Sequence, residues 1–464
     1  MHNRKAPAET KPDPSAPGLR DLPAIERVLK DPTLEPTVHE FGEHSVKHAL
    51  RGLQAQMRDR REVPTWATEP SGYILPIRER LAKIAYTPIF NLTGTIVHTN
   101  LGRALLSQEV WRQVEPLVTR PMNLEYDLRL GRRGDRDAVV EERLCRLTGC
   151  EAATIVNNNA AALMLVLNTF ALGRSVPVSR GELVEIGGSF RLPELMQRAG
   201  CRLLEVGTTN RTRIDDFADV AGEAAMLLKI HPSNFYIEGF TEAVDAGALA
   251  ALAKEHDIPS CVDLGSGSLI PLEQWGLPGE PTPQAALHQG VDLVTYSGDK
   301  LLGGVQSGII AGRRDLIEQI RKNPMKRALR ADKITLAVLE ATLKLYDNPQ
   351  TLAENLPLLR TLLLEPDTLH DRAGTLGPRL PPSLQWEIVP STVQIGSGAL
   401  PDKTIPSVAL ALTHPTHGAE ALANALRDLP TPVIGRIHDE VLLLDMRGAE
   451  PLEELGEMLA SLPL

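Results

Sequence analysis

The chain has 464 residues, which is too long for one ordinary domain and fits two or three. A hydrophobic content of 42% is enough for a sizeable core, while a net charge of −10 excludes a protein that grips nucleic acid over its whole surface. No apolar run approaches the roughly 18–20 residues that span a bilayer, so no membrane partner is expected. The polar, Pro-rich stretch 1–20 lacks the apolar core of a signal peptide and is predicted to be a disordered leader.

Residues 21–85 are predicted to form a small helical domain. Apolar residues recur at helical spacing in two stretches, first at Leu22, Ile25 and Leu29 and then at Val46, Leu50, Leu53 and Met57. Positive charge is concentrated toward one end of this domain, at Lys47, Arg51, Arg58, Arg60 and Arg61. This cluster is either a binding surface for an acidic partner or a solvated helix face.

Residues 86–335 are predicted to form a large α/β domain, because short apolar strands alternate with helical stretches such as Leu192–Ala199 and Ala246–His256. The predicted strands are Ala153–Val156, Ser175–Ser179, Arg202–Val206, Met226–Ile230, Ser260–Asp263, Leu293–Tyr296 and Gly308–Ala311. Such alternation indicates a mostly parallel sheet with helices on both faces. Ligands of these sheets lie beyond the carboxyl ends of the strands, so the residues that follow each strand are the informative ones.

Residues 336–464 are predicted to form a smaller α+β domain, opened by a long helix at Ile334–Tyr346. Further elements are expected as strands at Glu387–Pro390, Ser407–Leu412 and Val441–Asp445 and as helices at Ala419–Leu429 and Leu452–Leu462. The four cysteines form neither a CxxC pair nor a spacing typical of zinc, so no metal site is expected.

Three strand ends carry residues with chemical potential. After the first strand, Asn157-Asn158-Asn159-Ala160-Ala161 opens a helix whose N-terminal amides suit a phosphate, although an asparagine there is also an ordinary helix cap. Asp263 follows another strand and precedes a Gly-rich turn. Lys300 follows a third, in Ser297-Gly298-Asp299-Lys300, where small neighbours leave room for a ring and Ser297 is within reach of a phosphate oxygen.

Together these residues indicate a pyridoxal phosphate (PLP) site. PLP needs a lysine amine for a Schiff base and a carboxylate that keeps its pyridinium nitrogen protonated, and its phosphate suits a helix N-terminus. We therefore predict Lys300 as the Schiff-base lysine, Asp263 as the ring partner, and Asn158, Asn159, Ala160 and Ser297 as cofactor-binding residues. His231 follows the Met226–Ile230 strand and is either a cofactor contact or a loop histidine.

Arginines occur where an anionic substrate would need them. Arg103 follows the short apolar segment at residues 96–98, and Arg327 and Arg330 share one face if their segment is helical. The planar guanidinium binds phosphate-like anions through two hydrogen bonds, although a solvated basic helix explains the last two residues equally well.

The sequence resembles the bacterial selenocysteine synthase family, L-seryl-tRNA(Sec) selenium transferases, over nearly the whole chain from about residue 20. The motifs that carry this resemblance are Asn91–Arg103, Ser179–Gly188, Asp263–Ser268, Ser297–Gly304, Arg327–Lys333 and Pro432–Ile437. The resemblance implies an aspartate-aminotransferase-like fold (PLP fold type I), with a large domain built on a mostly parallel sheet, a small C-terminal α+β domain and an N-terminal helical domain that binds tRNA. It also implies a cytoplasmic homo-oligomer, a ring of dimers forming a decamer, with no DNA partner.

The resemblance implies a reaction as well. Seryl-tRNA(Sec) becomes selenocysteinyl-tRNA(Sec) through PLP-dependent β-elimination of water to an aminoacrylyl group, followed by addition of selenium from selenophosphate. Lys300 is the catalytic lysine, and Arg103, Arg327 and Arg330 are the candidate selenophosphate ligands.

Two other functions fit parts of the pattern. The main alternative is a PLP-dependent β-eliminating lyase that acts on a small amino acid or amino sugar, since such relatives share the core motifs but generally lack the N-terminal helical unit. The other is a tRNA-binding protein with a decayed cofactor site, which the intact Lys300 turn and Asp263 disfavour.

Overall fold

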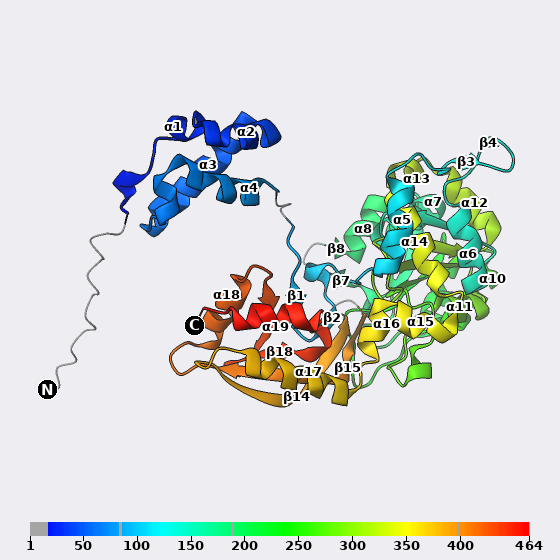
Figure 1. Ribbon diagram of the computed structural model, residues 1–464. Helices are drawn as coiled ribbons and strands as arrows, with labels where there is room; N and C mark the ends of the chain where they lie inside the picture. The colour runs from blue at the N-terminus through cyan, green and yellow to red at the C-terminus, as the bar shows by residue number, and fades with distance from the viewer. Residues whose placement is uncertain (1–16, 83–85, 187–189, 397–398, 464) are drawn as a thin grey trace. The chain divides into compact units, whose positions relative to one another are not determined.

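The computed structural model describes residues 17–82, 86–186, 190–396 and 399–463. The chain separates into two compact units, Met1–Pro88 and Ile89–Leu464 (Figure 1). Most of the predicted leader lies outside the described residues, but its last part is structured, since Leu19–Asp21 forms a turn of 3-10 helix. Among the described residues, no helix is both long and apolar enough to cross a membrane.

The first unit is helical, as predicted. It contains α1 (Ile25–Leu29), α2 (Glu35–Phe41), α3 (Glu43–Arg60) and α4 (Ile74–Ala82). The core contains the apolar face predicted for the second helix, with Val46 and Leu50 fully buried and Met57 nearly so. The buried amide of Gln54 donates to the Pro23 carbonyl at 2.8 Å and ties α3 to the segment before α1.

The second unit is built on a five-stranded sheet in the order β10-β11-β12-β13-β5. These strands are β5 (Ala152–Val156), β10 (Leu227–Ile230), β11 (Ser260–Gly265), β12 (Leu293–Ser297) and β13 (Gly308–Gly312). Strands β10, β11 and β12 are parallel, and β13 runs antiparallel to both β12 and β5. Consequently β5, β10, β11 and β12 end at the same edge of the sheet.

Two further strands, β6 (Ser175–Ser179) and β9 (Arg202–Val206), form a parallel pair. A single bridge between Ser175 and Ala224 connects this pair to the segment before β10. All seven strands predicted for this region are present, and each lies within two residues of its predicted bounds.

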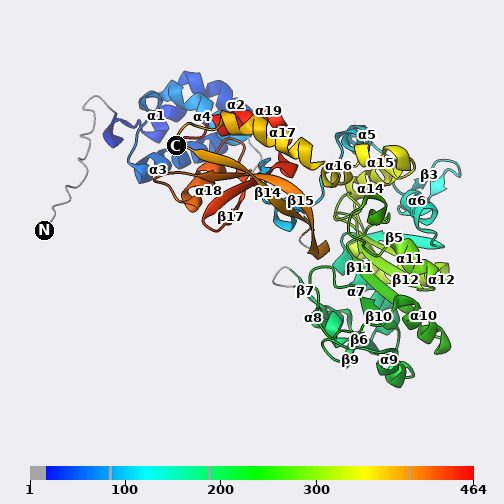
Figure 2. The same cartoon turned by 90° about the horizontal axis from the view of Figure 1, so that it is seen from below.

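Helices cover both faces of the main sheet (Figure 2). One buried core includes residues of α7 (Asn159–Ala171), α8 (Leu192–Ala199) and α12 (Arg314–Lys322). The other includes residues of α6 (Ala138–Thr148), α10 (Ala246–Glu255), α11 (Pro283–His288) and α14 (Lys333–Leu345). A smaller apolar cluster joins α14 to α5 (Gln108–Val118).

A second five-stranded sheet has the order β17-β18-β15-β14-β2. Its strands are β2 (Thr95–Val97), β14 (Gln385–Gly396), β15 (Ala399–Thr413), β17 (Arg436–His438) and β18 (Val441–Asp445). Its core includes residues of α17 (Pro366–Leu376), α18 (Ala419–Arg427) and α19 (Leu452–Ala460).

Segments on each side of the boundary predicted at residue 336 pack with the domain on the other side. β2 pairs in parallel with β14, and β1 (Phe90–Asn91) pairs in parallel with β16 (Val433–Ile434), so residues near 90 belong to the C-terminal sheets. In the other direction, Leu336, Leu339 and Leu343 of α14 are buried in the core of the large sheet.

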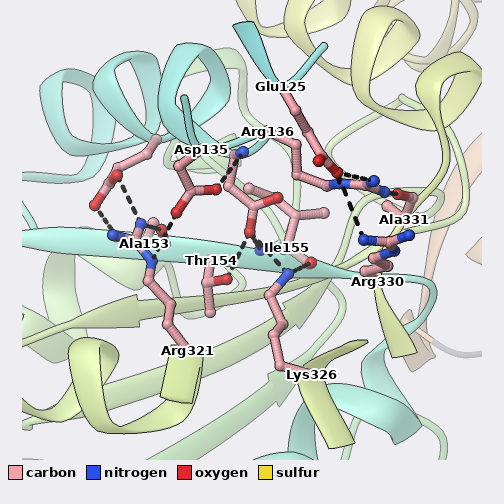
Figure 3. A network of polar contacts seen from close by, with 12 residues as sticks. Glu125, Asp135, Arg136, Ala153, Thr154, Ile155, Arg321, Lys326, Arg330 and Ala331 are labelled. Carbon is pink, nitrogen blue, oxygen red and sulfur yellow. Dashed lines mark hydrogen bonds and ion pairs between the residues drawn. The ribbon is translucent and has the colours of Figure 1, made fainter. Parts of the chain in front are cut away.

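A network of charged side chains fixes α13 (Pro324–Leu329) and the start of α6 to β5 (Figure 3). Oδ2 of the buried Asp137 accepts from Thr154 Oγ1 at 2.6 Å, from the Ile155 amide at 3.2 Å and from Lys326 Nζ at 2.8 Å. Lys326 also donates to the Ile155 carbonyl at 2.5 Å. A buried ion pair is costly to break, because removing one partner leaves the other charge uncompensated.

Replacing Asp137 by Ala is therefore expected to lower the free energy of unfolding by about 3–5 kcal/mol. The control is Asp315→Ala, which removes an exposed carboxylate paired with Arg313 at 2.8 Å and should cost less than about 1 kcal/mol. Urea unfolding followed by circular dichroism measures both. Equal losses in the two variants would contradict a stabilising role for the Asp137–Lys326 pair.

Candidate active site

A cavity of about 450 Å³ lies at the edge where β10, β11 and β12 end. Eight of the predicted site residues line it, from segments far apart in the sequence: Arg103, Asn158, Asn159, Ala160, His231, Asp263, Ser297 and Lys300. The two other predicted residues, Arg327 and Arg330, are not in its wall. The main sheet brings seven of the eight together because β5, β10, β11 and β12 end at one edge, whereas Arg103 comes from the segment after β2 of the other sheet.

Lys300 follows β12 on a tight turn and is partly buried in the cavity wall. Burial lowers the pKa of its amine, and the neighbouring Arg103 guanidinium lowers it further. The carboxylates of Asp263, Asp299 and Glu280 oppose this shift but do not cancel it. A lysine with a lowered pKa is neutral at lower pH than usual, which suits a nucleophile or a base.

Asp263 is buried at the end of β11, and its Oδ1 atom accepts three hydrogen bonds. The donors are Asn159 Nδ2 at 2.8 Å, Thr295 Oγ1 at 3.0 Å and the Gly265 amide at 3.1 Å. Burial raises the pKa of this carboxyl, while these donors and Lys300 act in the opposite direction. All three donors bind Oδ1, and no donor among the described residues binds Oδ2, which can accept from the N–H of a protonated ring nitrogen.

The turn after β5 has the features of an anion site. Asn158 caps α7, its side chain accepting from the Ala161 amide at 2.9 Å, and α7 runs for 13 residues behind it. The helix dipole and the amides of the first turn therefore face this end of the cavity. A side chain on Gly308 of β13 would overlap the Asn158 carbonyl, so the close approach of β13 to this turn requires glycine.

The cavity wall fits a PLP molecule. It offers an amine, a carboxylate with an available oxygen and a helix N-terminus. Among the described residues, the buried Asn159 Oδ1 has no hydrogen-bond partner and would be satisfied by a bound group. Gly267, with a φ of +75°, lies so close to Ser297 that a Cβ would overlap the Ser297 carbonyl, which keeps the Lys300 turn against the Asp263 loop.

His231 is in the cavity wall, as one of its two predicted roles requires. Its amide donates to the Asp263 carbonyl at 2.8 Å, and its Nε2 lies 3.3 Å from Oε1 of the buried Glu280. Nearby, the buried Glu182 accepts from Lys229 Nζ at 2.7 Å and from the Ile230 amide at 2.9 Å, which ties the segment after β6 to β10.

Arg103 and Arg330 differ in their surroundings. Arg103 Nη1 lies 2.6 Å from Asp299 Oδ2, and its backbone has a φ of +65°. Arg330 lies outside α13, contrary to the expectation of a shared helix face with Arg327, because the helix ends at Leu329 and the Arg330 backbone is extended. It forms an isolated bridge with Val156, and its side chain lies 3.5 Å from Glu125 Oε1. Arg327 is exposed on α13.

The sequence predictions omitted three residues that organise this site. Thr295 pairs in register with Asp263 across the parallel strands, and its hydroxyl is a polar exception in an apolar strand. Asp299, next to Lys300, binds Arg103, and Glu280 Oε1 lies 3.3 Å from His231 Nε2. The polar residue inside β12 was a signal available for Thr295, whereas nothing local marks Glu280.

Comparisons with known proteins show the family to which this chain belongs. The family model described as L-seryl-tRNA selenium transferase matches residues 89–450, and the one described as selenocysteine synthase N terminal matches residues 19–58. The L-seryl-tRNA(Sec) selenium transferase of Serratia proteamaculans is 48% identical over 95% of this chain and 98% of its own length. That of Methylocella silvestris is 48% identical over 92% and 94%.

A solved structure of D-glucosaminate-6-phosphate ammonia-lyase superimposes with a TM-score of 0.60 at 19% identity, covering 83% of this chain and 97% of its own. The predicted fold class is thus confirmed. Since the two matched models together span most of the described residues, the chain belongs to the L-seryl-tRNA selenium transferase family.

Proposed function

We propose that this protein is a PLP enzyme that converts seryl-tRNA(Sec) to selenocysteinyl-tRNA(Sec), with selenophosphate as the selenium donor. The observation that carries the proposal is the meeting of Lys300, Asp263 and the N-terminus of α7 around one cavity, in a chain whose close relatives bear this activity in their names. We further propose a cytoplasmic location and a homo-oligomeric ring of dimers, a decamer.

The N-terminal unit favours this function over a lyase that acts on a small amino acid or amino sugar. A small substrate gives no use to a separate helical domain, whereas a tRNA needs a second binding surface. Arg51 in the middle of α3, Arg60 at its end and Arg61 just after it are exposed, while Lys47 is paired with Glu26 at 2.5 Å. We propose residues 21–85 as the tRNA-binding domain, with these exposed arginines facing phosphates.

The residues that would hold the cofactor have separate roles. When bound, PLP supplies an aldehyde that reacts with amines and a ring that accepts electrons from the α-carbon of an amino acid. Lys300 would hold the aldehyde carbon, Asp263 would accept the ring N–H, and the first turn of α7 with Asn158, Asn159 and Ala160 would bind the phosphate together with Ser297. His231 would lie against the ring.

The substrate-directed roles fall to Lys300 and the arginines. The Lys300 amine, when not bound to the cofactor, would remove the seryl α-proton, and the β-hydroxyl would leave as water. Selenium bonds to the β-carbon, and water cleaves the phosphorus–selenium bond, so that the net change exchanges hydroxyl for selenol and releases phosphate. Arg103, in the cavity wall, would bind selenophosphate. Arg327 and Arg330 remain candidates, since Arg330 pairs with the last residue of β5.

The first test measures selenocysteine on tRNA after incubation with PLP, seryl-tRNA(Sec) and selenophosphate. Wild-type protein is expected to form the product, and Lys300→Ala is expected to form none, because it lacks both the cofactor amine and the base. Exchange of the seryl α-proton with solvent, followed by mass spectrometry, separates the two roles. If Lys300→Ala still exchanged that proton, another group would be the base.

The pH dependence of PLP uptake tests the charge balance at Lys300. PLP reacts with the neutral amine, which predominates above its pKa. Arg103→Ala removes a cation that lowers the pKa of Lys300. It also removes the partner of the Asp299 carboxylate, which raises that pKa. Both effects act in one direction, so the midpoint of PLP binding, followed by cofactor absorbance without tRNA, is expected to move to higher pH. Arg103→Lys keeps the charge and should stay near wild type; a downward shift in Arg103→Ala would contradict this account.

Salt dependence tests the N-terminal surface. The double substitution of Arg60 and Arg61 by Gln should weaken tRNA binding and reduce the slope of log K against log salt by about two, one for each phosphate that is no longer neutralised. PLP absorbance should not change. The matched control is Arg146→Gln, an exposed arginine of α6 in the other unit. If the control and the double variant lowered the slope equally, the tRNA contact would not be specific to α3.

A further inference from the structure

Three hollows in the second unit are neighbours, because each shares a wall residue with the next. Arg103 is in the wall of the Lys300 cavity and also of a second cavity of about 390 Å³. Gln108, at the start of α5, is in the wall of that second cavity and of a surface hollow that also contains Trp111 and Arg112. These hollows thus lie one beside the next from the surface of α5 to the Lys300 cavity, and we name this series the α5 track.

The walls of the α5 track combine apolar and cationic groups. In the second cavity, Ile96, Leu101 and Leu358 offer apolar surface, and its volume lies within the range of small-molecule sites, about 300–1,000 Å³. The charged side chains of this cavity are three arginines and two carboxylates: Arg103, Arg360, Arg447, Asp445 and Glu450.

Large apolar side chains are exposed along the α5 track. Leu105, in the wall of the second cavity, is 67% exposed, and Trp111 on α5 is 45% exposed. The indole of Trp111 has Arg112 beside it in the chain, and both border one hollow. An accessible aromatic ring next to a cation is the combination that binds single-stranded nucleic acid, with a base stacked on the ring and a phosphate near the cation.

The proposed substrate determines what the α5 track would receive. Its serine is an ester of the 3′-terminal ribose of the tRNA, so when the serine reaches Lys300 the last nucleotide must lie within a few bonds of it. The second cavity shares Arg103 with the Lys300 cavity and is therefore its neighbour. The preceding nucleotides, which are single-stranded, would then follow the α5 track outward to α5.

We propose that the α5 track binds the single-stranded 3′ end of the substrate tRNA. The terminal adenosine occupies the second cavity, a preceding base stacks on Trp111, and Arg112 and Arg360 face the phosphates. Arg112 lies 3.6 Å from Glu109 and Arg360 3.3 Å from Glu450, but these pairs are exposed and contribute little, so a phosphate can replace the carboxylate. The inference rests on the proposed function and names residues for its substrate.

Substitutions at Trp111 test the proposal. Trp111→Ala is expected to lower kcat/KM for seryl-tRNA(Sec) about tenfold, the loss typical of one base–aromatic stack, mainly through KM. Trp111→Phe keeps an aromatic face and should recover most of it. The control is Leu117→Ala, on the same helix and 46% exposed but in the wall of none of these hollows. It should match wild type.

A second measurement uses the unmodified protein and does not depend on how a variant folds. Seryl-tRNA(Sec) with 8-azidoadenosine as its terminal nucleotide is cross-linked by light, and the attached peptide is identified by mass spectrometry. Attachment within residues 91–108 or 357–361 supports the proposal, and attachment only elsewhere overturns it.

The outcomes separate this inference from the function on which it rests. If wild-type protein makes no selenocysteinyl-tRNA, the proposed function fails. If it does, but Trp111→Ala equals wild type, the α5 track alone fails. If Trp111→Ala changes the oligomeric state measured by sedimentation while its assembled fraction keeps full kcat/KM, the exposed surface is a contact between copies of this chain, and the proposal is wrong.

Discussion

The site depends on the hydrogen bonds that converge on Oδ1 of Asp263. Asn159 comes from the start of α7, Thr295 from the middle of β12 and Gly265 from the end of β11, so one carboxylate oxygen joins three segments. A buried carboxylate would be costly without such donors. Its partners therefore fix the distance between the anion-binding turn, the acid and the strand that leads to Lys300, and they orient the second oxygen toward a ligand.

Many charged side chains of this protein form ion pairs with one another. In the network at β5, Lys326 donates to Oδ2 of the buried Asp137, and Arg136 Nε donates to Glu125 Oε1 at 3.0 Å (Figure 3). Glu125 Oε1 also lies 3.5 Å from Arg330. These pairs hold the segment that contains Arg327 and Arg330 beside the strand that ends at the anion-binding turn. The net charge of −10 consequently says little about local binding, which depends on the few cations whose partners are weak or exposed.

The sequence was most informative where a local pattern determines structure. Buried strands such as Leu293–Ser297 read as short apolar runs, and a lysine on a small-residue turn at such a strand end is rare enough to mark Lys300. Long-range effects were not predictable in this way. The extended backbone of Arg330 follows from its bridge to Val156, and the parallel pairing of β2 with β14 leaves no mark in either segment. Thr295 matters because of the register between β11 and β12, which no single strand encodes.

The pairing of β1 with β16 also governs when the site can be completed during synthesis. Phe90 lies opposite Val433, and β2, which lies opposite β14, leads directly to Arg103. At about 5–20 residues per second, a ribosome needs roughly 20–70 s to make the partner of Phe90 after Phe90 itself. Until then the buried side chains of Phe90 and Leu92 are exposed to solvent and to chaperones. The ribosome thus makes the Lys300 turn before it makes the strands that position Arg103. The complete pocket is therefore among the last parts of the protein to form.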